Sequence, residues 1–62
     1  MTRLRRFARA HYRAQLSAGD PSLWTTLRAA RSVLDRPLRP EETHEIECGW
    51  TEAERYRAEV AL

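Results

Sequence analysis

The sequence predicts an all-α fold, a small bundle of three to four short helices. Its clearest pattern is an apolar stripe at steps of four, three and four, which lies along one side of a helix. The stripe comprises Leu23, Leu27, Ala30 and Leu34. Residues that favour helix ends separate this run from similar runs on either side. The helices are expected at about residues 2–18, 21–35, 41–48 and 52–62.

The chain has 62 residues, which allows a single small domain over 1–62. A core of that size supplies only about 3–5 kcal/mol of net stability, so self-association or docking on a larger protein is expected. Cys48 is the single cysteine, which excludes an internal disulfide and suits a reducing compartment. No apolar run approaches the ~20 residues that span a bilayer, and no signal-peptide core follows the first arginines. The predicted location is therefore cytoplasmic.

The first helix, over 2–18, is basic, amphipathic and without an acidic residue. Thr2 is its expected N-cap, and Gly19 is placed to end it. Its apolar face holds Leu4, Phe7, Ala8, His11, Ala14 and Ala18. This pattern is also typical of a mitochondrial transit peptide or of a helix that lies on a membrane surface. We favour neither, because loss of residues 1–19 leaves a remnant near the ~40-residue limit for folding, and the apolar face has no tryptophan.

Three arginines share the polar side of this first helix. Arg6, Arg9 and Arg13 recur at i, i+3 and i+7 and therefore fall together. One interpretation is a solvated face, which is the usual fate of a charge run. The other is a surface that holds phosphates or carboxylates, helped by Arg3 and Arg5.

The second helix is expected to begin with Asp20 as N-cap and Pro21 at its first position, and to pack between the first and last helices. Trp24 lies beside its apolar stripe. Arg28 and Arg31 follow at i+4 and i+7, so one of them can lie over the indole. We favour Trp24 packing against the first helix. The functional alternative is an exposed Trp24–Arg28 patch that anchors a partner.

Residues 36–40, Arg-Pro-Leu-Arg-Pro, are expected to form a short extended linker with Leu38 turned inward. This linker separates the basic part of the chain from the acidic part. Residues 41–48 carry two signals. Proline followed by two glutamates favours a helix start, whereas residues 43–48 alternate with the period of a strand. A strand would need a partner from another chain, so we predict a short helix.

Gly49 is expected to end that short helix. The stretch Thr51-Glu52-Ala53-Glu54 is a capping box that predicts the start of the last helix, over 52–62. Three larger side chains of this part are expected to face the core: Trp50, Tyr56 and Val60.

The helix–glycine–helix pattern over 43–57 loosely resembles the turn of a helix-turn-helix, a DNA-binding motif. It departs from that motif at Glu45, where a small apolar residue is expected. Glu52 and Glu54 open the second helix, and DNA phosphates would repel them. If DNA is bound, the expected contacts are the arginines of the first helix.

The net charge of +2 hides a division along the chain. Residues 1–39 hold nine Arg and two Asp, and residues 40–62 hold two Arg and seven Glu. There is no lysine. This division permits attraction between the two ends of one chain, head-to-tail association of copies, or an anionic partner for the basic part.

No pattern in the sequence specifies a reaction. His44 and Cys48 at i, i+4 could join a zinc site with His11 and a glutamate, or make a nucleophile, but one cysteine is too few for a recognisable structural site. Nothing singles out two of the seven glutamates as acid and base. Both glycines are interpreted as helix ends, so there is no glycine-rich phosphate loop. We therefore predict no enzymatic activity for the isolated chain, no metal and no cofactor.

The function predicted from these patterns is a small non-enzymatic interaction module, an accessory subunit, adaptor or inhibitor. It is expected to dock on a larger protein or on another copy of itself. The residues expected to contact the partner are Arg6, Arg9, Arg13, Trp24 and Arg28. The alternative is a nucleic-acid-binding regulator that uses the same basic helix as a dimer. A subunit that completes the active site of a larger enzyme is a third possibility.

Overall fold

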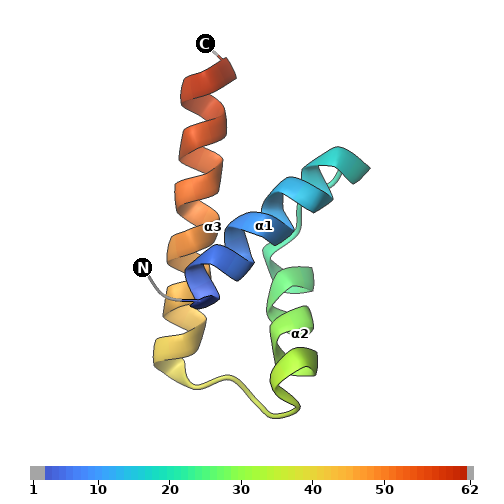
Figure 1. The fold of residues 1–62 in the computed structure, drawn as a ribbon, viewed down its shortest axis with the longest axis vertical. Coiled ribbons are helices and arrows are strands. Elements are labelled where there is room, and N and C mark those ends of the chain that lie inside the picture. The colour runs from blue at the N-terminus through green and yellow to red at the C-terminus, as the bar shows by residue number, and fades with distance from the viewer. Residues whose placement is uncertain (1–2, 62) are drawn as a thin grey trace.

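A computed structural model describes residues 3–61 and contains three α-helices (Figure 1). They are α1 (Arg3–Ala18), α2 (Leu23–Leu34) and α3 (Pro40–Ala61). The predicted all-α class is confirmed, and residues 41–48 are helical rather than a strand. The expected cap at Thr2 and the chain end at Leu62 lie outside the described residues. No helix within residues 3–61 has the length and apolar content needed to cross a membrane.

The helix pair at the centre of the fold is α1 with α3, not α2 with its neighbours. In Figure 1, α2 descends to a loop from which α3 rises beside it in the opposite direction, and α1 crosses obliquely in front of α3 and passes above the start of α2. The contact between α1 and α3 is much more extensive than the contact of α2 with either helix. The prediction that α2 packs between the other two is therefore wrong. Its leucine stripe covers one edge of the α1–α3 pair.

Two small clusters of buried side chains fill the core. In the first, Ala8 of α1, Ala30 of α2 and Ile46 of α3 meet, and each is at most 2% exposed. Five partly buried side chains cover this cluster: Leu4, Phe7, Leu23, Leu27 and Leu38. In the second, the rings of Tyr12 and Trp50 meet edge to face, with centroids 4.9 Å apart. Burial of Trp50 confirms the expectation that it packs on the core.

Gly49 lies inside α3, where α1 crosses it, and does not end a helix. The residue is buried, and a Cβ placed on it would stand 2.5 Å from the carbonyl oxygen of Arg5 and 2.8 Å from its Cα. The absence of a side chain thus allows the two backbones to approach closely. The predicted break at Gly49 and capping box at Thr51 are wrong, because Thr51 is an exposed residue within the helix. Residues 43–57 therefore form no turn between two helices, and the resemblance to a helix-turn-helix is not borne out.

The end of α1 follows the prediction. Gly19 has a φ of 106°, its N–H donates to the Leu16 carbonyl, and the Asp20 N–H donates to the Gln15 carbonyl. This pair of hydrogen bonds is the Schellman motif, which satisfies carbonyls that the helix leaves open. The expected glycine termination of α1 is therefore confirmed.

The start of α2 differs from the prediction by two residues. Ser22, not Asp20, is the N-cap, and its hydroxyl accepts a hydrogen bond from the Thr25 N–H. The Gln15 side chain fixes this choice, because its carbonyl oxygen accepts from the Ser22 N–H and its amide donates to the hydroxyl of buried Thr26. Both Asp and Ser are good caps, and a contact with α1 decides between them.

The last part of α3 extends beyond the other helices, as Figure 1 shows. Tyr56 and Val60 were expected to face inward, but they are 70% and 66% exposed. The prediction is wrong because α1 crosses α3 lower down, at the level of Gly49, and the last buried residue of α3 is Ala53.

Candidate functional site: a basic groove between α1 and α3

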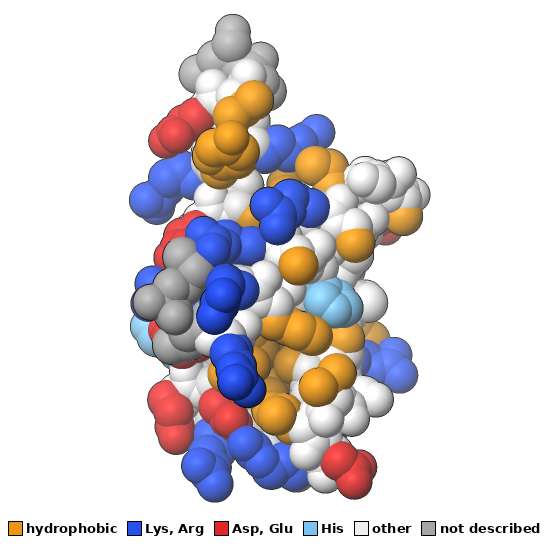
Figure 2. Space-filling view, viewed as in Figure 1, with side chains coloured by type: hydrophobic (Ala, Val, Ile, Leu, Met, Phe, Trp, Pro, Cys, Tyr) orange, Lys and Arg blue, Asp and Glu red, His pale blue; other side chains and the backbone are white. Residues whose placement is uncertain are grey.

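The three arginines of the polar side of α1 line one groove of about 640 Å³. Its opposite wall belongs to α3. We call this surface the basic groove. Its lining residues are Arg6, Arg9, Ala10, Arg13, Glu52, Ala53 and Tyr56. Figure 2 shows a column of basic side chains over this part of the molecule. The helical spacing of the arginines thus predicts one wall of the groove.

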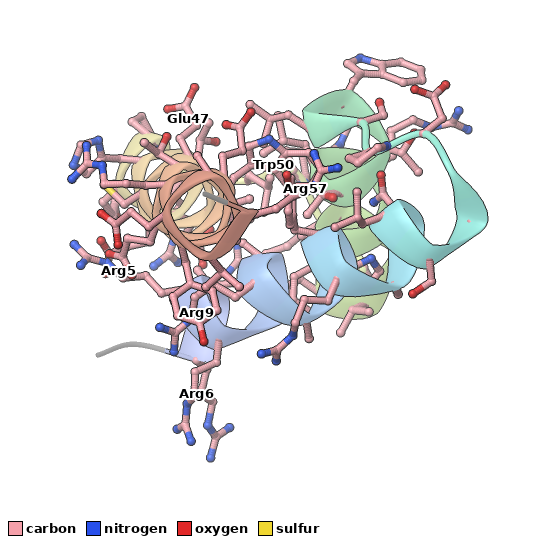
Figure 3. All side chains as sticks on the ribbon, turned by 90° about the horizontal axis from the view of Figure 1, so that it is seen from above. Arg5, Arg6, Arg9, Glu47, Trp50 and Arg57 are labelled. Atoms are coloured by element: carbon pink, nitrogen blue, oxygen red, sulfur yellow. The ribbon has the colours of Figure 1, made fainter. Side chains whose placement is uncertain are left out.

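The arginines of the groove have different surroundings. Arg9 is one-third exposed, and its Nη1 lies 3.7 Å from Oε2 of Glu52. Arg6 and Arg13 are exposed, and neither forms an ion pair with another residue of the described range 3–61. In Figure 3, Arg6 points away from α3 while Arg9 lies beside that helix. Arg6 and Arg13 therefore present their guanidinium groups to an incoming ligand.

Arg5 binds α3 instead of supplementing the groove. Its Nε and Nη2 each lie 3.0 Å from Oε2 of Glu45, and its Nη1 lies 3.1 Å from Oε1 of Glu52. The hydrogen bond and charge of Glu45 raise the pKa of Arg5 above its usual value. The expectation that Arg5 helps to bind a partner is not supported. The basic and acidic parts of the chain therefore attract each other, at least in part, within one molecule.

Sequence reasoning missed the α3 wall of the basic groove. Glu52 and Tyr56 reach it because α3 is continuous past Gly49. A signal for this continuity exists, since Ile46, Trp50 and Ala53 recur at i, i+4 and i+7. Reading the helix through Gly49 would have placed Glu52 and Tyr56 on the next turn beside that stripe.

The predicted Trp24–Arg28 pair forms on α2. The guanidinium carbon of Arg28 lies 4.7 Å from the centroid of the Trp24 ring, within the range of a cation–π interaction. Trp24 is 65% exposed, so the favoured prediction that it packs against the first helix is wrong. The pair borders a hollow of about 340 Å³ that shares no lining residue with the basic groove. The five predicted contact residues thus form two surfaces.

His44 and Cys48 also lie together, with Nε2 and Sγ 3.5 Å apart on one side of α3. His11, which the zinc hypothesis added, instead stacks on Phe7 with ring centroids 4.2 Å apart. Within residues 3–61, no three side chains of His, Cys, Asp or Glu are close enough to hold a metal ion together.

Comparison of the chain with protein-family models, with curated proteins and with solved structures finds no significant match. The chemistry of the site therefore has to be inferred from its geometry. The basic groove offers three planar guanidinium groups, two of them without an ion pair within residues 3–61, next to an exposed phenol ring. Such groups bind carboxylates or phosphates in a forked geometry.

Proposed function

We propose that this chain is a non-enzymatic docking module, and that its basic groove receives an acidic segment of a partner protein. The observation that carries the proposal is that Arg6 and Arg13, exposed and without an ion pair within residues 3–61, line one groove with exposed Tyr56. Arginine and tyrosine are enriched among the residues that dominate the energy of protein interfaces. The exposed Trp24–Arg28 pair, again an aromatic ring beside an arginine, supplies a second anchor.

The composition of the groove favours a polypeptide over a nucleic acid. Glu52 stands in its α3 wall, where it bridges Arg5 and Arg9. Its charge opposes any anion, and it opposes the closely spaced charges of a phosphate backbone most. A peptide carboxylate is smaller and can pair with Arg6 or Arg13 while an apolar neighbour covers Tyr56. The nucleic-acid-binding regulator therefore enters the test below as the competing outcome.

The test measures binding of two fluorescent probes, a poly-L-glutamate peptide and a random-sequence DNA duplex, by anisotropy at low and physiological salt. The wild-type chain is expected to bind the peptide more tightly than the duplex. Reversal of charge in the Arg6→Glu/Arg13→Glu variant is expected to weaken peptide binding by about tenfold or more, because two attractive contacts become repulsive. Circular dichroism should show unchanged helicity, since both side chains are exposed.

The matched control is Arg55→Glu/Arg57→Glu, which alters the net charge equally at two exposed positions outside both the groove and the hollow beside Trp24. This variant should retain most of the peptide affinity. Equal losses in the two variants would mean that binding follows net charge alone, and the groove would be refuted. Tighter binding of the duplex, with a steep salt dependence that Arg6→Glu/Arg13→Glu removes, would establish the nucleic-acid regulator instead.

A further inference from the structure

His44 and Cys48 form an accessible pair on α3 that the proposed function leaves unused. His44 is exposed and Cys48 is half-buried, and their Nε2 and Sγ atoms lie 3.5 Å apart. Neither residue lines the basic groove. Imidazole nitrogen and thiolate sulfur are the donors that Zn²⁺ prefers, and a spacing of four residues on a helix allows two side chains to bind one ion. We call these residues the His44–Cys48 pair.

The separation of the two donor atoms fits a zinc ion. In tetrahedral sites, Zn²⁺ lies about 2.3 Å from a cysteine sulfur and about 2.0–2.1 Å from a histidine nitrogen. At the tetrahedral angle, these bond lengths put the sulfur and the nitrogen about 3.6 Å apart. The observed 3.5 Å is therefore close to the separation that one shared ion would impose. In the absence of metal, the same contact is a hydrogen bond between thiol and imidazole.

The His44–Cys48 pair supplies half of the ligands that a closed zinc site needs. Structural zinc sites have four protein ligands. Over residues 3–61, no third His, Cys, Asp or Glu side chain is placed to bind the same ion. Two copies related by a two-fold axis through the ion would supply two cysteines and two histidines, which is one of the usual ligand sets of structural zinc. A second copy of this chain therefore completes the site with no further residue.

The surroundings of the pair permit such a bridge. The pair borders a hollow of about 440 Å³, whose other charged residues are Arg5, Glu47, Glu52 and Arg55. These two arginines and two glutamates balance in charge, so a cation meets no net repulsion from the hollow. The two thiolates of two copies would neutralise the charge of Zn²⁺ itself. Small domains commonly gain stability from a structural metal or from oligomerisation, and this site would provide both.

We propose that this chain binds Zn²⁺ at the interface of a two-fold dimer, with Nε2 of His44 and Sγ of Cys48 from each copy as the four ligands. Each thiol releases its proton to the solvent when its sulfur binds the metal, so one ion displaces two protons. The expectation of no metal rested on the single cysteine of one chain, and a second copy supplies another. Because the pair lies outside the basic groove, the proposal is independent of the proposed function.

The test is a titration of the metal-free, reduced chain with Co²⁺, which binds the same ligands and, unlike Zn²⁺, absorbs visible light. Two thiolates and two imidazoles should give the visible bands of a tetrahedral ion and a near-ultraviolet thiolate-to-cobalt band. The bands should saturate at one ion per two chains and disappear when Zn²⁺, which binds more tightly, is added. Sedimentation velocity in a thiol-free reductant should show more dimer with Zn²⁺ than with EDTA, and the reductant excludes a dimer linked by a disulfide.

Two single variants remove the ligands. Cys48→Ser and His44→Ala should each lower the affinity for Co²⁺ by more than about a hundredfold, because loss of the neighbours that merely orient a ligand already costs about 10–100-fold. Circular dichroism should show the fold retained, since neither residue belongs to the buried clusters. The matched control is Glu47→Gln, which changes an exposed residue of the same hollow and should bind Co²⁺ like the wild type.

Four results would refute the proposal. The first is a wild type that shows no tetrahedral cobalt bands. The second is saturation at one ion per chain without dimerisation, which would mean that a single copy holds the metal. The third is tight binding that persists in Cys48→Ser or His44→Ala. The fourth is an equal loss of binding in Glu47→Gln, which would mean that a carboxylate takes the place assigned to the second copy.

Discussion

Gly49 is the residue on which the α1–α3 crossing depends. Alanine in a helix interior is ordinarily more stable than glycine by about 1 kcal/mol. Here the added Cβ would stand 2.5 Å from the Arg5 carbonyl oxygen, and a backbone neighbour cannot rotate aside as a side chain can. We therefore expect Gly49→Ala to destabilise the fold by about 1–3 kcal/mol, the usual range for overpacking. Thermal melting followed by circular dichroism measures it, as a fall in Tm of about 5 °C or more.

Thr51→Ala is the control for this substitution. Thr51 is an exposed residue of the same helix, two positions after Gly49, and alanine there has a higher helix propensity than threonine. It should leave Tm unchanged or raise it slightly. If Gly49→Ala also raised Tm, α1 and α3 would not approach each other as closely as described. At this scale the sequence misled, because a glycine that ends a helix and one that admits a second helix look alike without knowledge of the partner.

Glu42 links the two ends of the connection between α2 and α3. Both of its carboxylate oxygens accept from the Arg36 guanidinium, at 2.8 and 2.7 Å, and Oε1 also accepts from the Arg39 N–H at 2.8 Å. The contact with the Arg39 N–H is half of a capping box, in which a glutamate in the first turn of a helix accepts a hydrogen bond from the N–H of the N-cap residue. The start of α3 is therefore held by the residue that precedes Pro37.

These contacts make the stability of the domain sensitive to acid. The hydrogen bonds from Arg36, and then from the Arg39 backbone, lower the pKa of Glu42 from its ordinary 4.5 to about 2. Because the pKa is lower in the folded chain than in the unfolded chain, ionised Glu42 stabilises the fold above pH 4.5, and this contribution is lost as the pH falls toward about 2. Urea unfolding at a series of pH values should show the decline.

The variant that isolates this effect is Glu42→Gln, which should lower stability at neutral pH and flatten its decline below pH 4.5. Glu47→Gln removes an exposed carboxylate of the same helix and should keep the wild-type pH dependence. If the Glu42→Gln and wild-type profiles kept the same slope in acid, the Arg36 contact would not form in solution.

The helices themselves were largely predictable, because each carries its own period and end signals. The Schellman end at Gly19 is a local property and is confirmed. The helix over residues 41–48 is also confirmed, although it was preferred because a strand there would lack a partner in the chain. The cap of α2 was misplaced by two residues because Gln15 of another helix selects Ser22. The same limit applies to α2 as a whole, since an apolar stripe shows that a helix is covered but not by which partner.

At the scale of the whole molecule, the self-association expected of so small a core predicts that stability depends on concentration. Partner binding that favours the folded state raises the apparent free energy of unfolding by mass action. The Tm of the wild type should therefore rise with protein concentration. Scanning calorimetry at several concentrations checks this. A wild-type Tm that did not move would contradict a stabilising dimer.

One of the two walls of the candidate site could be predicted from the sequence. Arg6, Arg9 and Arg13 share a side of α1 for a local reason, so one wall of the basic groove follows from spacing alone. Its other wall depends on where α3 crosses, a contact between segments about forty residues apart that no local pattern encodes. Exposure of Trp24, Tyr56 and Val60 was missed for the same reason, because the short α1 leaves parts of both other helices uncovered.

The α1–α3 crossing also bears on how the chain folds while the ribosome makes it. Arg5 has its partners 40 and 47 residues further along the chain. Gly49, which the backbone of Arg5 approaches closely, lies between these two partners in the sequence. Closing such a long loop costs more entropy than joining neighbouring helices, and the contacts that repay it exist only after α3 has emerged. During synthesis, the basic first helix therefore waits without its acidic counterpart. Mutations that slow the formation of α3 would lengthen this interval. During it, the arginines of α1 are open to other anions near the nascent chain.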